Sequence, residues 1–510
     1  MSPGERKQVT DSVTRRVNVL VVMADEQSWN TMGCTGNPAA RTPQLDELAG
    51  ESTVFDACYT PFPLCCPART SLWTGLMPRH HGVLGNWRPI EPQLRSAGFA
   101  RSFADAGYYT HYNGKWHVPG TTPDRMGWAS SSAIPAVLNG QDRGRYIEEY
   151  REWAAGQGYT FDAKHIENLT AQDLAALAQR PYATSSLPLD AYLETWQCDR
   201  FLENLDQRPA DTPWLAVCSF NAPHFPMSVP SPYDRIIDRD KVRLPASWAG
   251  GTAGKPREVR ESHFARDFEH LSEEEWIEVT SHYLGLCALV DAQFGRIRRY
   301  LEDAGEWDRT VVVFTSDHGD LMGAHRLMEK GHWLHYEEDL RVPLIVRHPD
   351  GRASRNANFV SLCDIGPTLC EVAGVPWHEQ RDGRSFAAML GDASAAPIRD
   401  YVTAETMLHD GRPGGDGSPF HARDWQWPRD SLNLSVRTAG HRYVFRSHDE
   451  AELYDLVDDP HEQRNIAAAP EAAAVVARLA GLAADEVADV LPAAAALVRA
   501  PLASTAKGTS

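Results

Sequence analysis

A β-branched, apolar run at 17–24 leads directly into the acidic pair Asp25-Glu26. Such a run is typical of a parallel strand buried on both faces, because a half-exposed strand would alternate apolar with polar residues. The segments 214–220 and 310–315 repeat the pattern, and each ends just before polar residues. Between them, apolar residues recur at helical spacing from 283 to 297. Strands that alternate with helices predict an α/β fold with a mostly parallel, layered sheet.

The residue pattern changes after about residue 395, where shorter apolar segments replace the long buried runs. Segments at 400–404, 432–438 and 443–446 predict short antiparallel strands, and an alanine-rich helical stretch follows a further segment at 452–456. A chain of 510 residues is also long for a single core. We therefore expect four parts, which are an N-terminal extension at 1–16, a large domain at 17–395, a smaller C-terminal α+β domain at 396–500 and a mobile tail at 501–510.

The formal net charge of −19 argues against a nucleic-acid partner, because phosphate backbones are bound by clustered lysine and arginine. An anionic ligand would need a local cluster of positive charge. The apolar run at 17–24 is too short to span a bilayer and lacks the layout of a signal peptide, so we expect no membrane association. The nine cysteines are odd in number and scattered through apolar segments, which indicates reduced thiols and a cytoplasmic location. The oligomeric state does not follow from these residues.

Cys65 begins the segment Cys65-Cys66-Pro67-Ala68-Arg69, in which a proline and an arginine follow the first cysteine at fixed spacing. A lone cysteine is usually a buried packing residue, but this pattern indicates a chemical role. Pro67 is favourable at the start of a helix and predicts one at 68–74. The amino terminus of that helix would face an anion bound near Cys65.

Two pairs of polar residues, Asp25-Glu26 and Asp317-His318, follow two of the expected parallel strands. Because the carboxyl ends of parallel strands meet at one edge of a sheet, these side chains would form an uncompensated acidic cluster there. A divalent cation is the simplest compensation. Oxygen-rich ligation suits Ca²⁺ or Mg²⁺, and the imidazole of His318 also admits Mn²⁺.

Further segments carry cationic or imidazole side chains. Lys115 and His117 are two residues apart, so in an extended segment both would project to one face and suit an anion and a proton transfer. His224 follows the expected strand at 214–220 and is bracketed by prolines, which restrict the backbone around a candidate acid. Lys330 alone would be an ordinary surface lysine, and only its place in a longer pattern makes it a candidate.

Taken together, these segments resemble those of the formylglycine-dependent sulfatases, which are arylsulfatase-like members of the alkaline phosphatase superfamily. The resemblance covers most of 17–348, with a weaker likeness at 453–456. It implies an alkaline-phosphatase-like layered fold, with a large and mostly parallel central sheet flanked by helices, and a catalytic role for the domain at 17–395. The segments that carry it are Cys65-x-Pro67-x-Arg69, Gly114-Lys115-Trp116-His117, the stretch 221–226, Ser316-Asp317-His318-Gly319-Asp320, Lys330 and Arg341-Val342-Pro343.

The resemblance implies a sulfatase that hydrolyses a sulfate monoester to an alcohol and inorganic sulfate. In this family the motif cysteine is converted to formylglycine, so a formylglycine-generating enzyme is an expected maturation partner for Cys65. One hydroxyl of the aldehyde hydrate would attack sulfur while Asp317 accepts its proton. The hydrate would also bind the metal ion, with Ca²⁺ as the first expectation, and the metal ligands implied are Asp25, Glu26, Cys65, Asp317 and His318.

The resemblance assigns the remaining roles to cationic and imidazole groups. Lys115, His224 and Lys330 would bind the sulfate oxygens, and either His224 or Lys330 would protonate the leaving alcohol. Lys115 and Arg69 would steady the hydrate. His117 would take the remaining hydroxyl proton as sulfate departs and the aldehyde is regenerated. The alcohol that carries the sulfate is either a small molecule or a saccharide.

Two positions depart from the family pattern. Many members carry two aspartates where this chain has Asp25-Glu26, and many carry asparagine at the position of His318. The longer side chain and the imidazole leave open which metal binds and whether Glu26 reaches it. We interpret His325 and Glu337 either as residues that support the side chains of the site or as structural residues.

Alternative functions remain open at this point. Phosphonate monoester or phosphodiester hydrolases share the same modified cysteine, although the pair Lys115 and His117 favours sulfate. A non-catalytic protein that binds sulfated ligands could also use the fold. Tryptophans of the smaller domain could roof the substrate pocket or pack in a domain seam. These are Trp425 and Trp427, beside His409, His421 and Asp424.

Overall fold

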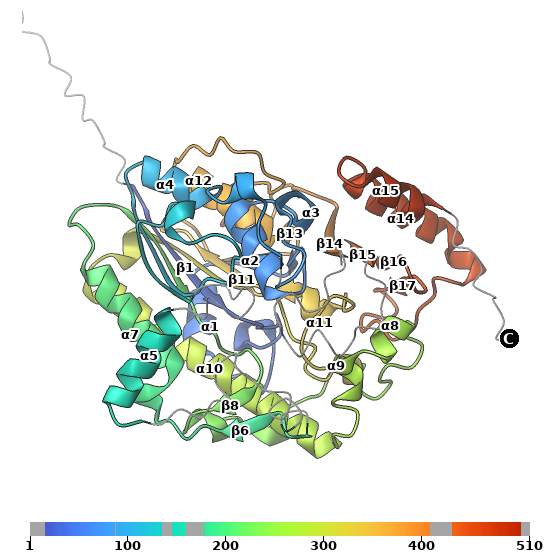
Figure 1. Ribbon diagram of the computed structural model, residues 1–510, viewed down its shortest axis with the longest axis horizontal. Coiled ribbons are helices and arrows are strands. Elements are labelled where there is room, and N and C mark those ends of the chain that lie inside the picture. Colours follow the sequence, from blue (N-terminus) through green and yellow to red (C-terminus); the bar gives the residue numbers. More distant parts are fainter. Residues whose placement is uncertain are drawn as a thin grey trace, which may run out of the picture.

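The computed structural model describes residues 16–86, 88–134, 145–159, 176, 179–407 and 431–500. Its centre is an eight-stranded sheet in the order β12-β2-β11-β9-β1-β7-β4-β5 (Figure 1). Neighbours from β9 to β5 are all parallel, and β11 pairs antiparallel with β9 and β2. The mostly parallel sheet expected from the sequence is confirmed. The strands are β1 (Asn18–Ala24), β2 (Thr53–Phe55), β4 (Tyr109–Lys115), β5 (Ser130–Ile134), β7 (Trp214–Ser219), β9 (Thr310–Ser316), β11 (Leu344–Arg347) and β12 (Ser354–Asn356).

Strand β1 is buried on both faces, as its continuous apolar run predicted. Val19 and Val21 pack into one hydrophobic core, and Leu20 and Val22 pack into another on the opposite face. Helices cover both faces of the sheet (Figure 1). The core of Leu20 includes α1 (Pro43–Ala49), α7 (Leu193–Asp206) and α10 (Glu273–Asp303), and the core of Val19 includes α2 (Cys65–Thr74), α4 (Phe99–Asp105) and α12 (Ile365–Val372).

Helix α10 contains the segment with helical spacing and extends well beyond it on both sides. Its start is fixed by a capping box, in which the Ser272 N–H donates to the Glu275 carboxylate at 2.8 Å and the Glu275 N–H donates to the Ser272 hydroxyl at 3.3 Å. These contacts pair amide groups that a helix terminus otherwise leaves unsatisfied. Within the described ranges, the chain has no helix whose length and apolar character would let it cross a membrane.

The C-terminal region forms a separate antiparallel sheet in the order β14-β15-β16-β17. The short strands and the alanine-rich helices expected there are confirmed, although the domain boundaries at 395 and 396 stay a prediction. This sheet and its helices lie beside the larger layered body (Figure 1). The elements are β14 (Tyr401–Met407), β15 (Leu432–Thr438), β16 (His441–Arg446), β17 (Glu452–Asp455), α14 (Ala473–Val487) and α15 (Pro492–Arg499).

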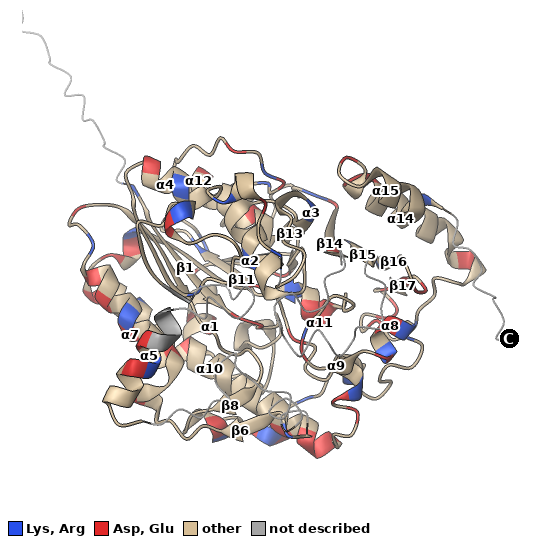
Figure 2. Cartoon of the chain, in the orientation of Figure 1, with Lys and Arg blue, Asp and Glu red and all other residues tan. Residues whose placement is uncertain are grey.

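Further helices and strands, most of them short, connect these elements along the chain. Figure 2 shows charged residues gathered on the outer helices, while the central strands are almost free of them. Residues 1–15 and 501–510, from the expected extension and tail, lie outside the described residues. The short elements are β3 (Cys58–Tyr59), β6 (Tyr182–Thr184), β8 (Met227–Val229), β10 (Arg341–Val342), β13 (Val360–Ser361), α3 (Pro78–His81), α5 (Arg145–Gly156), α8 (Arg257–Arg260), α9 (His263–Arg266) and α11 (Glu337–Leu340).

Candidate active site

Four adjacent parallel strands, β9, β1, β7 and β4, deliver their carboxyl ends to one edge of the sheet. Ala24 of β1 is paired with Ser316 of β9, so the next residues, Asp25 and Asp317, also lie side by side. The Glu26 N–H donates to the Asp317 carboxylate at 3.1 Å across this edge. The expectation that both acidic pairs meet at one sheet edge is confirmed.

Helix α2 starts at Cys65, three residues earlier than the predicted start at residue 68. The first intrahelical bond runs from the Ala68 N–H to the Leu64 carbonyl at 3.1 Å. Pro67 is tolerated inside this first turn because the amide that it lacks would have no acceptor within the helix. The earlier start places Cys65 itself at the amino terminus of the helix, where partial positive charge favours a bound anion.

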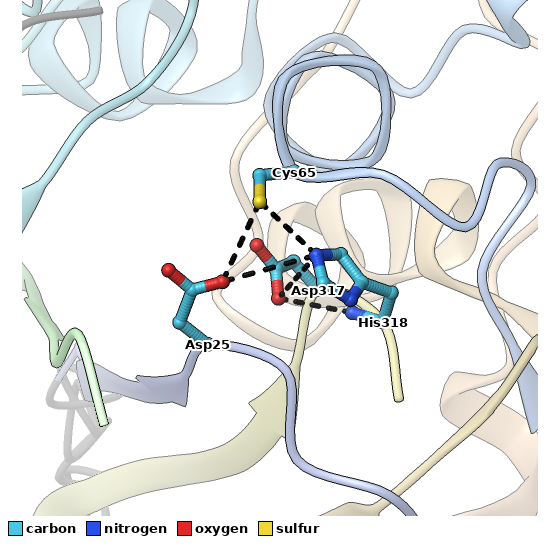
Figure 3. A group of neighbouring side chains, drawn as sticks. All are labelled: Asp25, Cys65, Asp317 and His318. Atoms are coloured by element: carbon cyan, nitrogen blue, oxygen red, sulfur yellow. Dashed lines mark hydrogen bonds and ion pairs between the residues drawn. The ribbon is translucent and has the colours of Figure 1, made fainter. Parts of the chain in front are cut away.

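Cys65 lies within a buried group of ligating side chains that also contains Asp25, Asp317 and His318 (Figure 3). Its Sγ is 3.1 Å from Nε2 of His318, 3.7 Å from the Asp25 carboxylate and 3.8 Å from Nζ of Lys115. One ligand atom from each of the four residues in the group lies within 4.8 Å of every other. Two carboxylates and an imidazole in a dry site fit a divalent cation, so the donor set agrees with the metal that the fold family implies.

The electrostatics of this group depend on the neighbouring cations. Burial would raise the pKa of Asp25, but the positive charges of Lys115 and Arg69 hold that pKa well below its usual range. Burial, assisted by Asp25, raises the pKa of the Cys65 thiol well above its usual range. A carboxylate is therefore kept ionised beside a thiol that stays protonated.

Arg69 is one helical turn after Cys65 and connects three strands from inside the protein. Its Nε donates to the Asp317 carboxylate at 2.7 Å, and its Nη1 donates to the Lys115 carbonyl at 2.6 Å and to the Ser219 hydroxyl at 2.8 Å. Its Nη2 lies 3.6 Å from the Asp25 carboxylate. The guanidinium therefore fixes the orientation of Asp317 and compensates part of the acidic cluster.

Lys115 is the last residue of β4, and its ammonium pairs with the Asp25 carboxylate. The extended segment expected through His117 is not observed, because the strand ends at Lys115 and His117 adopts a φ of +52°. Both residues nevertheless belong to the site. Burial and the positive charges of Lys115 and Arg69 lower the pKa of His117 well below its usual value, which leaves a neutral imidazole able to accept a proton.

Glu26, His224 and Lys330 form a second cluster beside the first. The Lys330 ammonium donates to the Glu26 carboxylate at 2.5 Å and to Nε2 of His224 at 3.0 Å. The contact between Nδ1 of His224 and the Phe225 carbonyl at 2.6 Å assigns the ring proton to Nδ1. Glu26 is thus engaged by Lys330 and lies outside the four-residue ligand group, so its role as a metal ligand stays a prediction.

Some residues that hold the site together were not predicted. The Asp320 carboxylate accepts from the N–H groups of Met322 at 2.7 Å and Glu329 at 3.1 Å, which ties down the loop that carries Lys330. Ser219, the last residue of β7, contacts Arg69, and its position near the end of a buried strand was the only available signal. The structural role expected for Glu337 agrees with its contacts to Tyr59, Arg437 and Arg442. The expected roof residues Trp425, Trp427, His409, His421 and Asp424 lie outside the described residues.

Comparison with known proteins identifies the family. The family model Sulfatase matches residues 17–375. An uncharacterized sulfatase, YidJ, from Escherichia coli strain K12 is 29% identical over 452 residues, which cover 87% of this chain and 84% of that protein. An arylsulfatase from Clostridium perfringens is 25% identical over 88% of this chain and 90% of its own length.

Solved structures agree with the fold. The phosphonate monoester hydrolase of Agrobacterium radiobacter aligns with a TM-score of 0.76 at 25% identity and covers 94% of this chain and 96% of its own. A protein in complex with its substrate D-glucosamine-2-N,6-O-disulfate aligns with a TM-score of 0.70 at 22% identity, over 94% of this chain and 98% of its own. The expected alkaline-phosphatase-like fold is confirmed. The chain belongs to the Sulfatase family and is a sulfuric ester hydrolase.

Proposed function

We propose that this chain hydrolyses a sulfate monoester to an alcohol and inorganic sulfate with a formylglycine made from Cys65. The observation that supports this proposal most strongly is that Cys65 lies at the amino terminus of α2 and that its Sγ contacts Asp25 and His318. Burial raises the pKa of the Cys65 thiol, so the unmodified side chain would be a poor nucleophile at neutral pH. A hydrated formylglycine would supply two hydroxyls on one carbon, one to attack sulfur and one to expel sulfate.

The ligand group around Cys65 supports a cation at this position. Asp25, Asp317, His318 and the modified Cys65 would hold the ion, and we propose Ca²⁺, with Mn²⁺ or Mg²⁺ as alternatives. The bound ion would supply positive charge for the sulfate oxygens. Three hydrogen bonds, from Arg69 and from two backbone N–H groups, fix the Asp317 carboxylate that would receive the first proton.

The second cluster supports protonation of the leaving alcohol. Lys330 keeps its proton because Glu26 and Glu329 counter the effect of burial and raise its pKa above its usual value. His224 presents Nε2 to the same ammonium. We assign the proton delivered to the alcohol oxygen to Lys330, with His224 as its hydrogen-bonded partner. His117, neutral and buried, would accept the hydroxyl proton when sulfate leaves.

The first test measures sulfate release from an aryl sulfate by the wild-type protein and by the Cys65→Ala variant. The proposal predicts turnover by the wild type and a loss of turnover in the variant, with an unchanged melting temperature. The neighbouring Cys66→Ala variant is the matched control and is expected to keep its activity, because Cys66 lies outside the four-residue ligand group. Equal turnover by Cys65→Ala and wild type would contradict the proposal.

Phosphonate monoester hydrolysis is the second candidate function. The observation that favours it is the similarity to the phosphonate monoester hydrolase of Agrobacterium radiobacter. Lys115 and His117 favour sulfate as the main substrate, because the segment Gly114-Lys115-Trp116-His117 resembles that of the sulfatases. Rates on an aryl sulfate and on the aryl phosphonate with the same leaving group decide between them. A panel of sugar sulfates and aryl sulfates would then define the alcohol.

A further inference from the structure

A second group of ligating side chains lies apart from the group around Cys65. It consists of His325, Glu338 and Glu462, and one ligand atom from each residue lies within 4.8 Å of the others. The three residues come from three segments: the loop after β9, helix α11, and the loop that follows β17. The group therefore joins the larger layered body to the C-terminal sheet.

His325 is the most unusual member of this group. It is only 1% exposed, yet neither Nδ1 nor Nε2 has a hydrogen-bond partner among the residues that the structure describes. Buried polar atoms are normally paired, so an imidazole with both nitrogens unpaired indicates a missing ligand. The ring is held against the Tyr336 ring, with centroids 4.6 Å apart.

The two glutamates supply negative charge to the same point. The Glu462 carboxylate is oriented by Arg442 and by the Glu337 N–H, the latter at 2.9 Å. Carboxylate oxygens of Glu338 and Glu462 lie within 4.8 Å of each other, so their negative charges repel. Lys255, which donates to the Tyr454 hydroxyl and the Glu462 carbonyl, offsets part of this repulsion, and Arg442 forms a buried ion pair with Glu462.

We infer that His325, Glu338 and Glu462 form a second metal site, which takes a divalent transition-metal ion such as Zn²⁺ or Mn²⁺. One imidazole and two carboxylates are a ligand set that these ions accept. Ligand atoms around a tetrahedral Zn²⁺ lie about 3.3 Å apart, so modest side-chain rotation closes the observed group around an ion. Water would complete the coordination.

The proposed second metal site would also hold the loop that carries Lys330 of the candidate active site. His325 lies in the chain between His318 and Lys330, on the loop that brings Lys330 to Glu26. Glu462 belongs to the C-terminal region. A metal bound by both would fasten this loop to the C-terminal sheet, and it would stabilise the folded protein because the unfolded chain lacks the preformed site.

The test measures metal binding in a background that lacks the ligands expected around Cys65. The full chain with Asp25→Asn, Cys65→Ala, Asp317→Asn and His318→Gln is freed of metal by a chelator and titrated calorimetrically with Zn²⁺ alone and with Mn²⁺ alone. We expect one ion per chain, together with a rise in melting temperature. Adding His325→Phe, which keeps a ring against Tyr336, is expected to weaken binding at least tenfold and to abolish the rise. The exposed His378→Gln is the matched control and is expected to change neither.

A replacement variant and a spectroscopic measurement complete the test. If His325→Phe does not fold, as judged by circular dichroism in chelator, Glu338→Gln replaces it, because Glu338 is at the partly exposed side of the group. Co²⁺ bound in the background variant is expected to give visible absorption bands that disappear with either substitution. A background variant that binds no ion, or equal binding with and without His325→Phe, would overturn the site. Neither result bears on sulfate hydrolysis at Cys65.

Discussion

Replacement of Arg69 by methionine removes the buried cation that joins α2 to three strands. The substitution removes the 2.7 Å donor to the Asp317 carboxylate and a donor to the Ser219 hydroxyl. The Lys115 carbonyl also loses its contact with Arg69 but keeps the one from the Tyr112 hydroxyl. Removal of one partner from a fully buried ion pair costs about 3–5 kcal/mol, because the remaining charge stays buried without compensation. We expect a loss of this size in the free energy of unfolding.

The assay is urea unfolding followed by fluorescence, with a chelator present so that no bound cation compensates Asp317. Arg69→Lys is expected to fall between Arg69→Met and wild type, because one ammonium cannot reproduce the three contacts of the guanidinium. The control is Arg200→Met, whose partly exposed pair with Glu203 contributes at most about 1 kcal/mol. A loss for Arg69→Met no larger than that for Arg200→Met would refute the reasoning.

Replacement of Lys330 by methionine is expected to lower kcat by about 30- to 1000-fold, which corresponds to about 2–4 kcal/mol, and to affect substrates with poor leaving groups most. The effect is measured on a series of aryl sulfates. An equal decrease in kcat for all leaving groups would show that Lys330 is not the acid. Burial lowers the pKa of His81 to about 3, so below about pH 6.5 the unfolded chain takes up a proton that the folded chain does not. As the pH decreases below this value, the free energy of unfolding is expected to decrease more steeply in wild type than in His81→Gln, by up to about 1.4 kcal/mol per pH unit. Parallel pH dependences of the two proteins in urea unfolding would contradict this. Gly114→Ala is expected to destabilise the fold, because at a φ of +95° its Cβ would lie 1.9 Å from the Ser219 carbonyl oxygen. The control Gly158→Ala, also at positive φ but in open space, is expected to lower the melting temperature much less. Similar melting temperatures for the two variants would argue against the clash.

Features encoded by local sequence were predictable. The apolar run before Asp25 is long enough to define a strand buried on both faces, and parallel pairing then places Asp25 beside Asp317. The start of α2 was misplaced because proline is compatible with several positions in the first helical turn, and the sequence around Pro67 does not distinguish them.

Features that depend on contacts between distant segments were not predictable. The pairing of Glu26 with Lys330 brings together residues about 300 positions apart, and no local pattern marks it. The same holds for His325, which in the sequence is one histidine in a loop. Only the packing of the C-terminal region against that loop shows that it lies beside Glu338 and Glu462.

The modification state of Cys65 tests the central claim most directly. The protein is produced with and without a co-expressed formylglycine-generating enzyme, and the peptide that carries Cys65 is quantified by mass spectrometry in each preparation. We predict that aryl sulfatase activity per chain rises in proportion to the fraction of this peptide whose –CH₂–SH group has become –CHO. Full activity in preparations whose Cys65 is entirely an unmodified thiol would contradict the account.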